Sequence, residues 1–271
     1  MLFRGAMSFG KSQFSCTHDG LTIRGEEYRP SESASNLPAV IISHGFMANH
    51  KSVIHYAEQF AEWGFAAYCY DFCGGCVSGK SDGETTQMSV FTEREDLKAV
   101  MAYVTGLSYV NPDRLILMGC SQGGFVSALT GAQLPEQVSA LILFYPALCI
   151  PDDARSGKMM FAKFDPADIP EVIPCGPMKL GRDYAASVLN LDPFEAIRSY
   201  PGPMLLVHGT TDKVVDVSYA NRAYDAYCSG EPSKHPEKRL LLIEDGAHGF
   251  SRKHDRIAID AVERFLKDME L

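Results

Sequence analysis

The residues with the clearest chemical potential surround Ser121, which lies in the pentapeptide Gly-Cys-Ser-Gln-Gly at residues 119–123. An apolar run at residues 115–118 precedes this pentapeptide, and a segment of helical character follows it. In a strand–turn–helix of this kind the glycines relieve crowding around a strained serine, whose hydroxyl projects above the sheet edge. The alternative is a serine that only caps the helix. The context favours a nucleophile at Ser121.

A serine nucleophile needs two partners, because its hydroxyl requires a base at neutral pH and the base requires a fixed tautomer. We expect an acid and a histidine at the ends of later strands. Asp212 follows the apolar run at residues 204–207, and His248 follows the run at residues 240–243. Ser121, Asp212 and His248 occur in the chain order of α/β-hydrolases. The sequence therefore predicts a triad of nucleophile, orienting acid and base.

Other residues compete for two of these roles. The rival acids at nearby loop positions are Asp192, Asp216 and Asp245. We expect Asp216 to cap the next helix, and Asp245 is too close to His248 in sequence to approach its ring easily. The rival histidines considered are His18, His208, His235 and His254. His208 ends a strand and is expected to be buried and structural, and the other three lack a strand-end position.

Two backbone N–H groups are predicted to stabilise the negative oxygen of a tetrahedral intermediate. The N–H of Gln122 is one of them. The second should come from the loop after an early strand, where residues 41–43 lead into His44-Gly45-Phe46. Gly45 permits a close backbone approach, and Phe46 can offer its N–H while its ring covers the acyl site. The alternative for His44-Gly45 is an ordinary turn at a strand end.

Cys73 and Cys76 form a C-x-x-C motif, which could bind zinc or act as a redox pair. No second C-x-x-C or paired-histidine motif is present to complete a tetrahedral zinc site. The motif also precedes the Gly- and Ser-rich residues 77–83 rather than starting a helix. We interpret the two thiols as incidental members of a flexible loop, and we expect neither a metal nor an organic cofactor.

The predicted secondary structure alternates in the way that a mainly parallel sheet requires. A strand pair turning at Asp19-Gly20 is followed by apolar runs at 39–43, 65–70, 115–118, 140–144, 204–207 and 240–243. Helices are expected at 52–63, 92–105, 122–133, 217–228 and 256–267. This predicts an α/β fold with helices flanking the sheet.

One interval, residues 146–191, breaks this alternation, with several prolines and acids and no convincing long element. A structureless loop of that length is improbable inside a compact domain. We therefore predict a small inserted cap at 146–191, with residues 1–145 and 192–271 forming one hydrolase core.

Composition limits the partners and the compartment. The chain has 271 residues, is 46% hydrophobic and carries a net charge of -9, the wrong sign for nucleic acid or an anionic membrane surface. Residues 1–10 lack the pattern of a secretory signal, and no run of about 18 apolar residues occurs. The eight cysteines are irregularly spaced, as expected for free thiols in a reducing compartment. We predict a cytoplasmic protein, and a homodimer stays open.

Several motifs together resemble bacterial feruloyl (cinnamoyl) esterases of the α/β-hydrolase fold. They are residues 44–46, 71–72, 79–83, the Ser121 turn, 208–212 and 246–248. The similarity runs over nearly the whole chain, and the family carries a small cap where residues 146–191 lie here. The loop after Asp71 departs from the family pattern, because it carries Cys73, Cys76 and what looks like a short insertion.

The resemblance also implies substrate-binding residues in the cap. Asp153 and Tyr184 look like the positions that bind the aromatic hydroxyl in some family members. A surface carboxylate and a packed cap tyrosine are the alternatives, and the sequence does not decide between them.

The sequence thus predicts hydrolysis by a serine nucleophile through an acyl-enzyme, and the resemblance implies a small-molecule ester substrate with a hydroxycinnamic acyl group. A lipase or monoacylglycerol lipase is the alternative within hydrolases, and a peptidase is less expected. A noncatalytic ligand-binding homologue is the alternative from another class.

Overall fold

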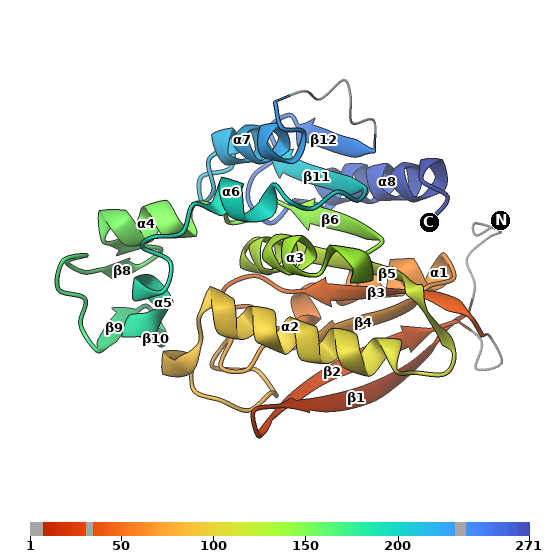
Figure 1. The fold of residues 1–271 in the computed structure, drawn as a ribbon, viewed down its shortest axis with the longest axis horizontal. Coiled ribbons are helices and arrows are strands. Elements are labelled where there is room, and N and C mark those ends of the chain that lie inside the picture. Colours follow the sequence, from red (N-terminus) through yellow and green to blue (C-terminus); the bar gives the residue numbers. More distant parts are fainter. Residues whose placement is uncertain (1–7, 31–34, 231–236) are drawn as a thin grey trace.

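The computed structural model describes residues 8–30, 35–230 and 237–271. His235 and most of the segment examined for a secretory signal lie outside these residues. Within them, eight strands form one sheet in the order β1-β2-β4-β3-β5-β6-β11-β12 (Figure 1). The strands are β1 Gly10–His18, β2 Leu21–Arg29, β3 Leu37–Ser43, β4 Ala66–Tyr70, β5 Val110–Cys120, β6 Ala140–Phe144, β11 Met204–Gly209 and β12 Lys238–Ile243.

The first two strands form the predicted antiparallel hairpin. Its turn consists of Asp19 and Gly20, whose φ angles of 45° and 79° are those of a two-residue turn that matches strand twist. β2 pairs with β4 in antiparallel fashion, and the pairs from β4 to β12 are parallel. All residues of β3, β4 and β6 are buried, which explains why these strands appear in the sequence as continuous apolar runs.

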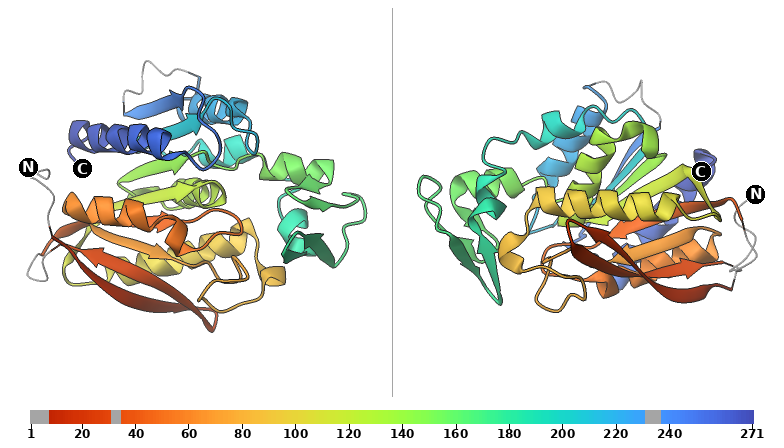
Figure 2. Two further views of the ribbon diagram at one scale, coloured as in Figure 1. Left: turned by 180° about the vertical axis from the view of Figure 1, so that it is seen from behind. Right: turned by 60° about the horizontal axis from the view of Figure 1, so that its bottom comes forward.

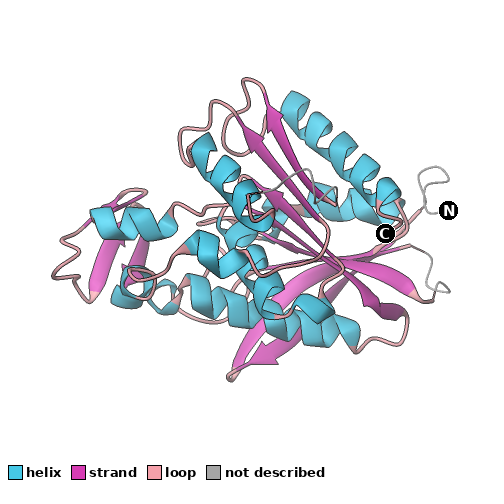
Figure 3. Cartoon of the chain, turned by 45° about the horizontal axis from the view of Figure 1, so that its top comes forward, coloured by secondary structure: helices cyan, strands magenta, loops and turns pink. Residues whose placement is uncertain are grey.

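Helices cover both faces of the sheet, as Figure 3 shows. One hydrophobic core joins the sheet to α2 Val90–Thr105, α3 Gln122–Gln133 and α7 Val217–Tyr227. The other joins it to α1 Ile54–Glu62 and α8 Arg252–Asp268. The structure therefore confirms the predicted α/β-hydrolase architecture.

Two predicted helix starts were too late, because side chains cap the helices further upstream. Ser89 accepts a hydrogen bond from the Thr92 N–H, so α2 begins at Val90. Ser251 accepts one from the His254 N–H, so α8 begins at Arg252. Short 3₁₀ helices in the described residues of the core are η1 His50–Ser52, η2 Thr85–Gln87 and η3 Pro135–Gln137.

Between β6 and β11 the chain leaves the main sheet. This interval contains α4 Ile150–Ser156, β7 Lys158–Met159, β8 Ala162–Lys163, β9 Val172–Cys175, β10 Met178–Gly181, α5 Arg182–Ala186 and α6 Pro193–Ile197. Figure 2 shows α4 to α5 at one end of the molecule, with two small sheets of their own. The division of the chain into a core and a cap at residues 146–191 stays a prediction, and we call residues 146–191, which end before α6, the predicted cap. None of the helices in the described ranges could cross a membrane.

Candidate active site

Ser121 lies between β5 and α3 with φ 54° and ψ -120°, a strained conformation for a residue other than glycine. Two glycines make this turn possible. A Cβ on Gly119 would lie 2.2 Å from the Gly123 carbonyl oxygen. A Cβ on Gly123 would lie 2.3 Å from the His44 carbonyl oxygen. The pentapeptide thus lets the turn close tightly and pack against the loop after β3.

The structure brings the three predicted triad residues together. His248 Nε2 lies 3.0 Å from Ser121 Oγ, and His248 Nδ1 lies 2.8 Å from Asp212 Oδ2. Asp212 and His248 meet because their loops follow β11 and β12, which are parallel neighbours. A Cβ on Gly209 would lie 2.2 Å from the Gly246 carbonyl oxygen, so these loops also touch. The geometry is that of a nucleophile, a base and an orienting acid.

The environment of Asp212 keeps its carboxylate charged. Burial alone would raise its pKa, but hydrogen bonds from His208, His248 and the Val215 N–H hold the pKa well below its usual value. Oδ1 accepts the N–H groups of Val214 and Val215 at 2.8 and 2.9 Å. A charged Asp212 fixes the proton of His248 on Nδ1, which leaves Nε2 free to accept the Ser121 proton.

The rival residues have other positions. Asp216 accepts the Ser218 N–H and caps α7, as predicted, and Asp192 caps α6. Asp245 is exposed. The prediction that His208 is buried is also confirmed, with its Nε2 3.0 Å from the Val215 carbonyl oxygen.

The Phe46 N–H, one of the two predicted oxyanion donors, is oriented by His44. His44 Nε2 accepts the Phe72 N–H at 3.2 Å, so the ring proton is on Nδ1 and is donated to the Gly45 carbonyl oxygen at 2.8 Å. The same oxygen accepts the Ala48 N–H. Because the Gly45–Phe46 peptide is trans, its N–H points away from this anchored carbonyl. Burial lowers the pKa of His44, which keeps the ring neutral for this arrangement.

The other predicted donor, the Gln122 N–H, is held in a similar way. The Ser121 carbonyl oxygen accepts the N–H groups of Phe125 and Ala147 at 3.1 and 3.0 Å. Within the described part of the chain, neither the Gln122 N–H nor the Phe46 N–H has a hydrogen-bond acceptor. Both loops lie beside the nucleophile, since a Cβ on Gly45 would be 3.1 Å from Ser121 Cβ. Their oxyanion role stays a prediction.

A cavity of about 620 Å³ opens at the Ser121–His248 pair. Its aromatic lining residues are Phe46, Tyr56, Tyr145 and Phe250, and its polar ones include Ser52, His55, Arg252 and Asp255. Asp255 accepts the Tyr56 hydroxyl at 2.5 Å and lies 3.5 Å from His55 Nε2. The volume and lining of the cavity suit a flat ring, and the lining also offers polar groups.

The two predicted cap residues do not line this cavity. Tyr184, in α5, is buried, and its hydroxyl donates to Gln122 Oε1 at 2.6 Å. Asp153, in α4, is half-buried, and burial raises its pKa. Their role in binding an aromatic hydroxyl stays a prediction.

A buried acid that we did not predict lies beside the nucleophile turn. Glu93, in the first turn of α2, accepts a hydrogen bond from Gln122 Nε2 at 2.7 Å. Its spacing of three residues from Val90 and four from Leu97 places it on the apolar face of the helix. That spacing could have identified Glu93 as a buried carboxyl.

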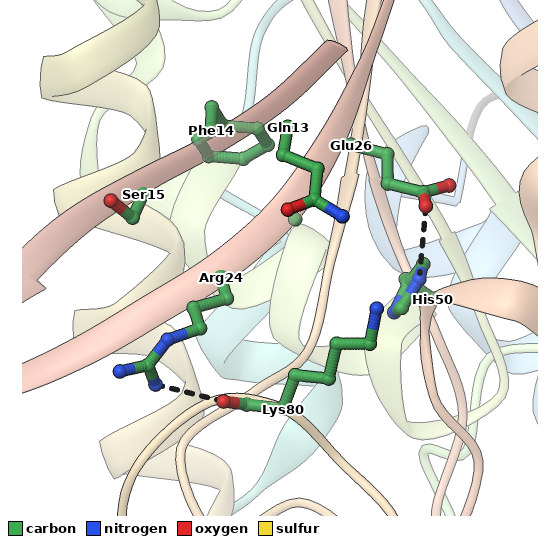
Figure 4. A pocket seen from close by; sticks show the side chains of 8 residues that line it. Gln13, Phe14, Ser15, Arg24, Glu26, His50 and Lys80 are labelled. Carbon is green, nitrogen blue, oxygen red and sulfur yellow. Dashed lines mark hydrogen bonds and ion pairs between the residues drawn. The ribbon is translucent and has the colours of Figure 1, made fainter. Parts of the chain in front are cut away.

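A second histidine–aspartate pair lies away from Ser121. His50 Nδ1 is 2.6 Å from Asp71 Oδ1. His50 lines a cavity of about 260 Å³ together with Gln13, Ser15, Arg24, Glu26 and Lys80 (Figure 4). Among the described residues no hydroxyl meets His50 Nε2, which has no hydrogen-bond partner. This pair therefore does not form a second triad.

The cysteine motif has no companion side chains that would complete a metal site in the described ranges. No group of three or more His, Cys, Asp or Glu side chains there could hold a metal ion. Cys73 and Cys76 are free thiols, as are the other six cysteines. Burial, together with the charge of Asp96, raises the pKa of Cys73 and disfavours a reactive thiolate.

The sheet order and the positions of Ser121, Asp212 and His248 after β5, β11 and β12 are those of α/β-hydrolases. Residues 34–183 match the family described as serine aminopeptidase, S33, and the chain belongs to that family. It is an α/β-hydrolase that resembles feruloyl esterases, as the sequence analysis expected.

The chain is similar to one solved structure and to sequence relatives that carry different names. Est1E from Butyrivibrio proteoclasticus, solved with ferulic acid bound, is 26% identical with a TM-score of 0.84, covering 94% of this chain and 98% of that one. Mouse monoglyceride lipase is 25% identical over 269 residues, covering 87% and 82%. The uncharacterized protein YfhR of Escherichia coli O157:H7 is 28% identical over 259 residues, covering 92% and 77%.

Proposed function

We propose that this chain is a serine carboxylic-ester hydrolase that releases hydroxycinnamic acids of the ferulic type through an acyl-enzyme. One observation carries the proposal, namely the continuous hydrogen-bonded array from Asp212 through His248 to Ser121, at 2.8 and 3.0 Å. Two N–H groups without acceptors, on Phe46 and Gln122, lie beside it in the described structure.

In the proposed reaction His248 removes the Ser121 proton as Oγ attacks the ester carbonyl carbon. The carbonyl oxygen becomes an oxyanion that accepts the Phe46 and Gln122 N–H groups. The carbon–oxygen bond to the alcohol then breaks, and His248 gives its proton to the departing alcohol. Water repeats the sequence on the acyl-enzyme, which releases the acid and restores Ser121.

The aromatic acyl group is supported by the likeness to Est1E with its bound ferulic acid and by the aromatic side chains around the cavity. Acylglycerol hydrolysis is a second candidate, because mouse monoglyceride lipase is a relative. Against it, the cavity is lined in part by the polar side chains of His55, Arg252 and Asp255, which a long apolar acyl chain could not hydrogen-bond. The family name makes peptide substrates a third class to include in the test.

The test compares rates on methyl ferulate, p-nitrophenyl acetate, a monoacylglycerol and an aminoacyl p-nitroanilide. We expect methyl ferulate to give the highest kcat/KM and Ser121→Ala to abolish turnover without unfolding the protein. Preference for the acylglycerol or the anilide would overturn the proposed substrate. Ester hydrolysis that persists in Ser121→Ala would overturn the proposed nucleophile.

Labelling with a fluorophosphonate separates an enzyme from a noncatalytic binding protein. We expect wild-type protein to be labelled at Ser121 and Ser121→Ala to remain unlabelled. Folded wild-type protein that resists labelling would favour a noncatalytic ligand-binding homologue.

We also propose a cytoplasmic location, supported by eight cysteines that are all free thiols. A small-molecule ester is the proposed partner, and size-exclusion chromatography with light scattering would decide whether the chain forms a homodimer.

A further inference from the structure

We propose that Tyr184 and Glu93 are positioning residues that act through the Gln122 side chain to hold the oxyanion N–H in place. This inference rests on the proposed function, because it concerns the same oxyanion site. It assigns Tyr184 a role different from binding the aromatic hydroxyl of a substrate.

The Gln122 side chain is held at both ends of its amide. Its Oε1 accepts the Tyr184 hydroxyl at 2.6 Å, and its Nε2 donates to Glu93 Oε2 at 2.7 Å. Nε2 also lies 3.6 Å from the sulfur of Met88. Gln122 is 1% exposed, so water does not compete for these bonds. A residue whose side chain is fixed in this way has little freedom to rotate its backbone N–H.

Tyr184 contacts both residues that offer the proposed oxyanion N–H groups. Its hydroxyl is bonded to Gln122, and its ring centroid lies 5.5 Å from that of Phe46. A phenol has one proton, and that proton is already donated to Gln122. Tyr184 therefore cannot also donate to a substrate without breaking the contact with the oxyanion residue.

Glu93 holds the Gln122 side chain from the core side, which completes the Tyr184–Gln122–Glu93 array of hydrogen bonds. It is 1% exposed, and among the described residues no cation pairs with it. Burial and the charge of Asp96 raise its pKa to about 8, so the carboxyl is mostly neutral at pH 7. A neutral carboxyl still accepts the hydrogen bond from Gln122 Nε2. An ionised Glu93 without a cation partner could accept the same bond, but its burial would cost more desolvation free energy.

The array also joins the predicted cap to the core. Tyr184 belongs to α5, which follows β10, and the Lys179 carbonyl oxygen in β10 accepts the Thr85 hydroxyl at 2.6 Å. A Cβ on Gly181 would lie 2.0 Å from the Thr86 carbonyl oxygen. The predicted cap therefore meets the core next to η2 and α2, so its position can influence the oxyanion N–H through Tyr184 and Gln122.

The test uses Tyr184→Phe with methyl ferulate and methyl cinnamate, which differ in the ring hydroxyl and methoxyl groups. Complete loss of an oxyanion donor typically costs about 10²–10³-fold in kcat. Because Tyr184→Phe loosens the donor without removing it, we expect roughly a 10-fold lower kcat on both esters with KM little changed. Fluorophosphonate labelling of Ser121 should slow by a similar factor.

The matched control is Tyr219→Phe. The Tyr219 hydroxyl donates to Asp152 in α4 at 2.7 Å, so it also joins the predicted cap to the core but does not touch Gln122. We expect its kcat and labelling rate to stay near those of the wild type. If Tyr219→Phe matched Tyr184→Phe, general docking of the predicted cap would replace the proposed role of Gln122.

Substitutions of Glu93 test the hydrogen bond at the Nε2 end of the Gln122 amide, and they remain informative if Tyr184→Phe fails to fold. Glu93→Gln keeps an oxygen acceptor for Gln122 and should retain kcat, whereas Glu93→Leu removes it and should lose about as much as Tyr184→Phe. An increase in KM confined to methyl ferulate would show that Tyr184 binds the aromatic hydroxyl and would overturn the inference. An unchanged labelling rate in both Tyr184→Phe and Glu93→Leu would also overturn it.

The labelling arm keeps this inference separate from the proposed function, since it needs no ester substrate. If the wild type is labelled but hydrolyses neither ester, the substrate assignment fails and the labelling rates of the variants still decide the inference. If the folded wild type is not labelled at all, both fail.

Discussion

Replacing Glu93 with glutamine is expected to remove a large pH dependence from the stability of the fold. The pKa of Glu93 is raised from 4.5 to about 8, with burial as the main cause. The folded protein therefore binds a proton that the unfolded chain releases above pH 4.5. The contribution of Glu93 is fully present below that pH and is lost progressively as the pH rises to about 8.

The loss of unfolding free energy follows from the shift in the pKa of Glu93. At about 1.4 kcal/mol per pKa unit, the wild type should lose on the order of 4 kcal/mol relative to Glu93→Gln between pH 5 and pH 9. Glutamine is similar in size and keeps the acceptor for Gln122 Nε2, so the substitution changes the titration more than the packing. The difference should be small at pH 5 and largest at pH 9.

Urea unfolding at pH 5, 7 and 9 measures this difference, with fluorescence of Trp63, the single tryptophan, as the signal. Glu95→Gln is the control on the same helix. Hydrogen bonds from Lys98 and Arg94 lower the pKa of Glu95 below 4.5 against the effect of burial, so the contribution of Glu95 is lost only at lower pH. The stability difference between wild type and this control should therefore stay nearly constant from pH 5 to pH 9. A stability difference between wild type and Glu93→Gln that stays constant across pH would refute the reasoning.

Two further substitutions test the geometry of the site. Asp212→Asn should lose on the order of 10⁴-fold in kcat, because an amide no longer fixes the His248 tautomer, whereas Asp216→Asn should keep its activity. Damage from Asp216→Asn alone in steady-state kinetics would mean that the acid is misassigned. Gly123→Ala should destabilise the fold or abolish fluorophosphonate labelling, because its Cβ would lie 2.3 Å from the His44 carbonyl oxygen. A stable and fully labelled Gly123→Ala protein would contradict the close packing described for this turn.

Local sequence predicted most of the core because each local signal agreed with the tertiary structure. The central strands are buried on both faces and so appear as unbroken apolar runs. α3 spans residues 122–133 as predicted, since it starts directly at the nucleophile turn. The relative positions of Ser121, Asp212 and His248 followed from chain order and strand ends, without any knowledge of contacts.

Other features depend on contacts between distant segments, which local patterns do not encode. The elements of the predicted cap span two to seven residues, too short to show a clear periodicity. Nothing in the sequence near Tyr184 indicates that its hydroxyl meets Gln122, 62 positions away. The role of His44 in orienting the Gly45–Phe46 peptide likewise depends on the Phe72 N–H, which comes from another strand end.

The hydrogen bond from the Ala147 N–H to the Ser121 carbonyl oxygen has a consequence for engineering. Ala147 is the second residue of the predicted cap, so a chimaera that exchanges this interval at residue 146 would also replace an anchor of the nucleophile. A donor cap should instead be joined after Ala147, and it should not place proline there, because proline has no N–H to donate. Substrate preference could then be varied by recombination while the peptide that carries the nucleophile keeps its orientation.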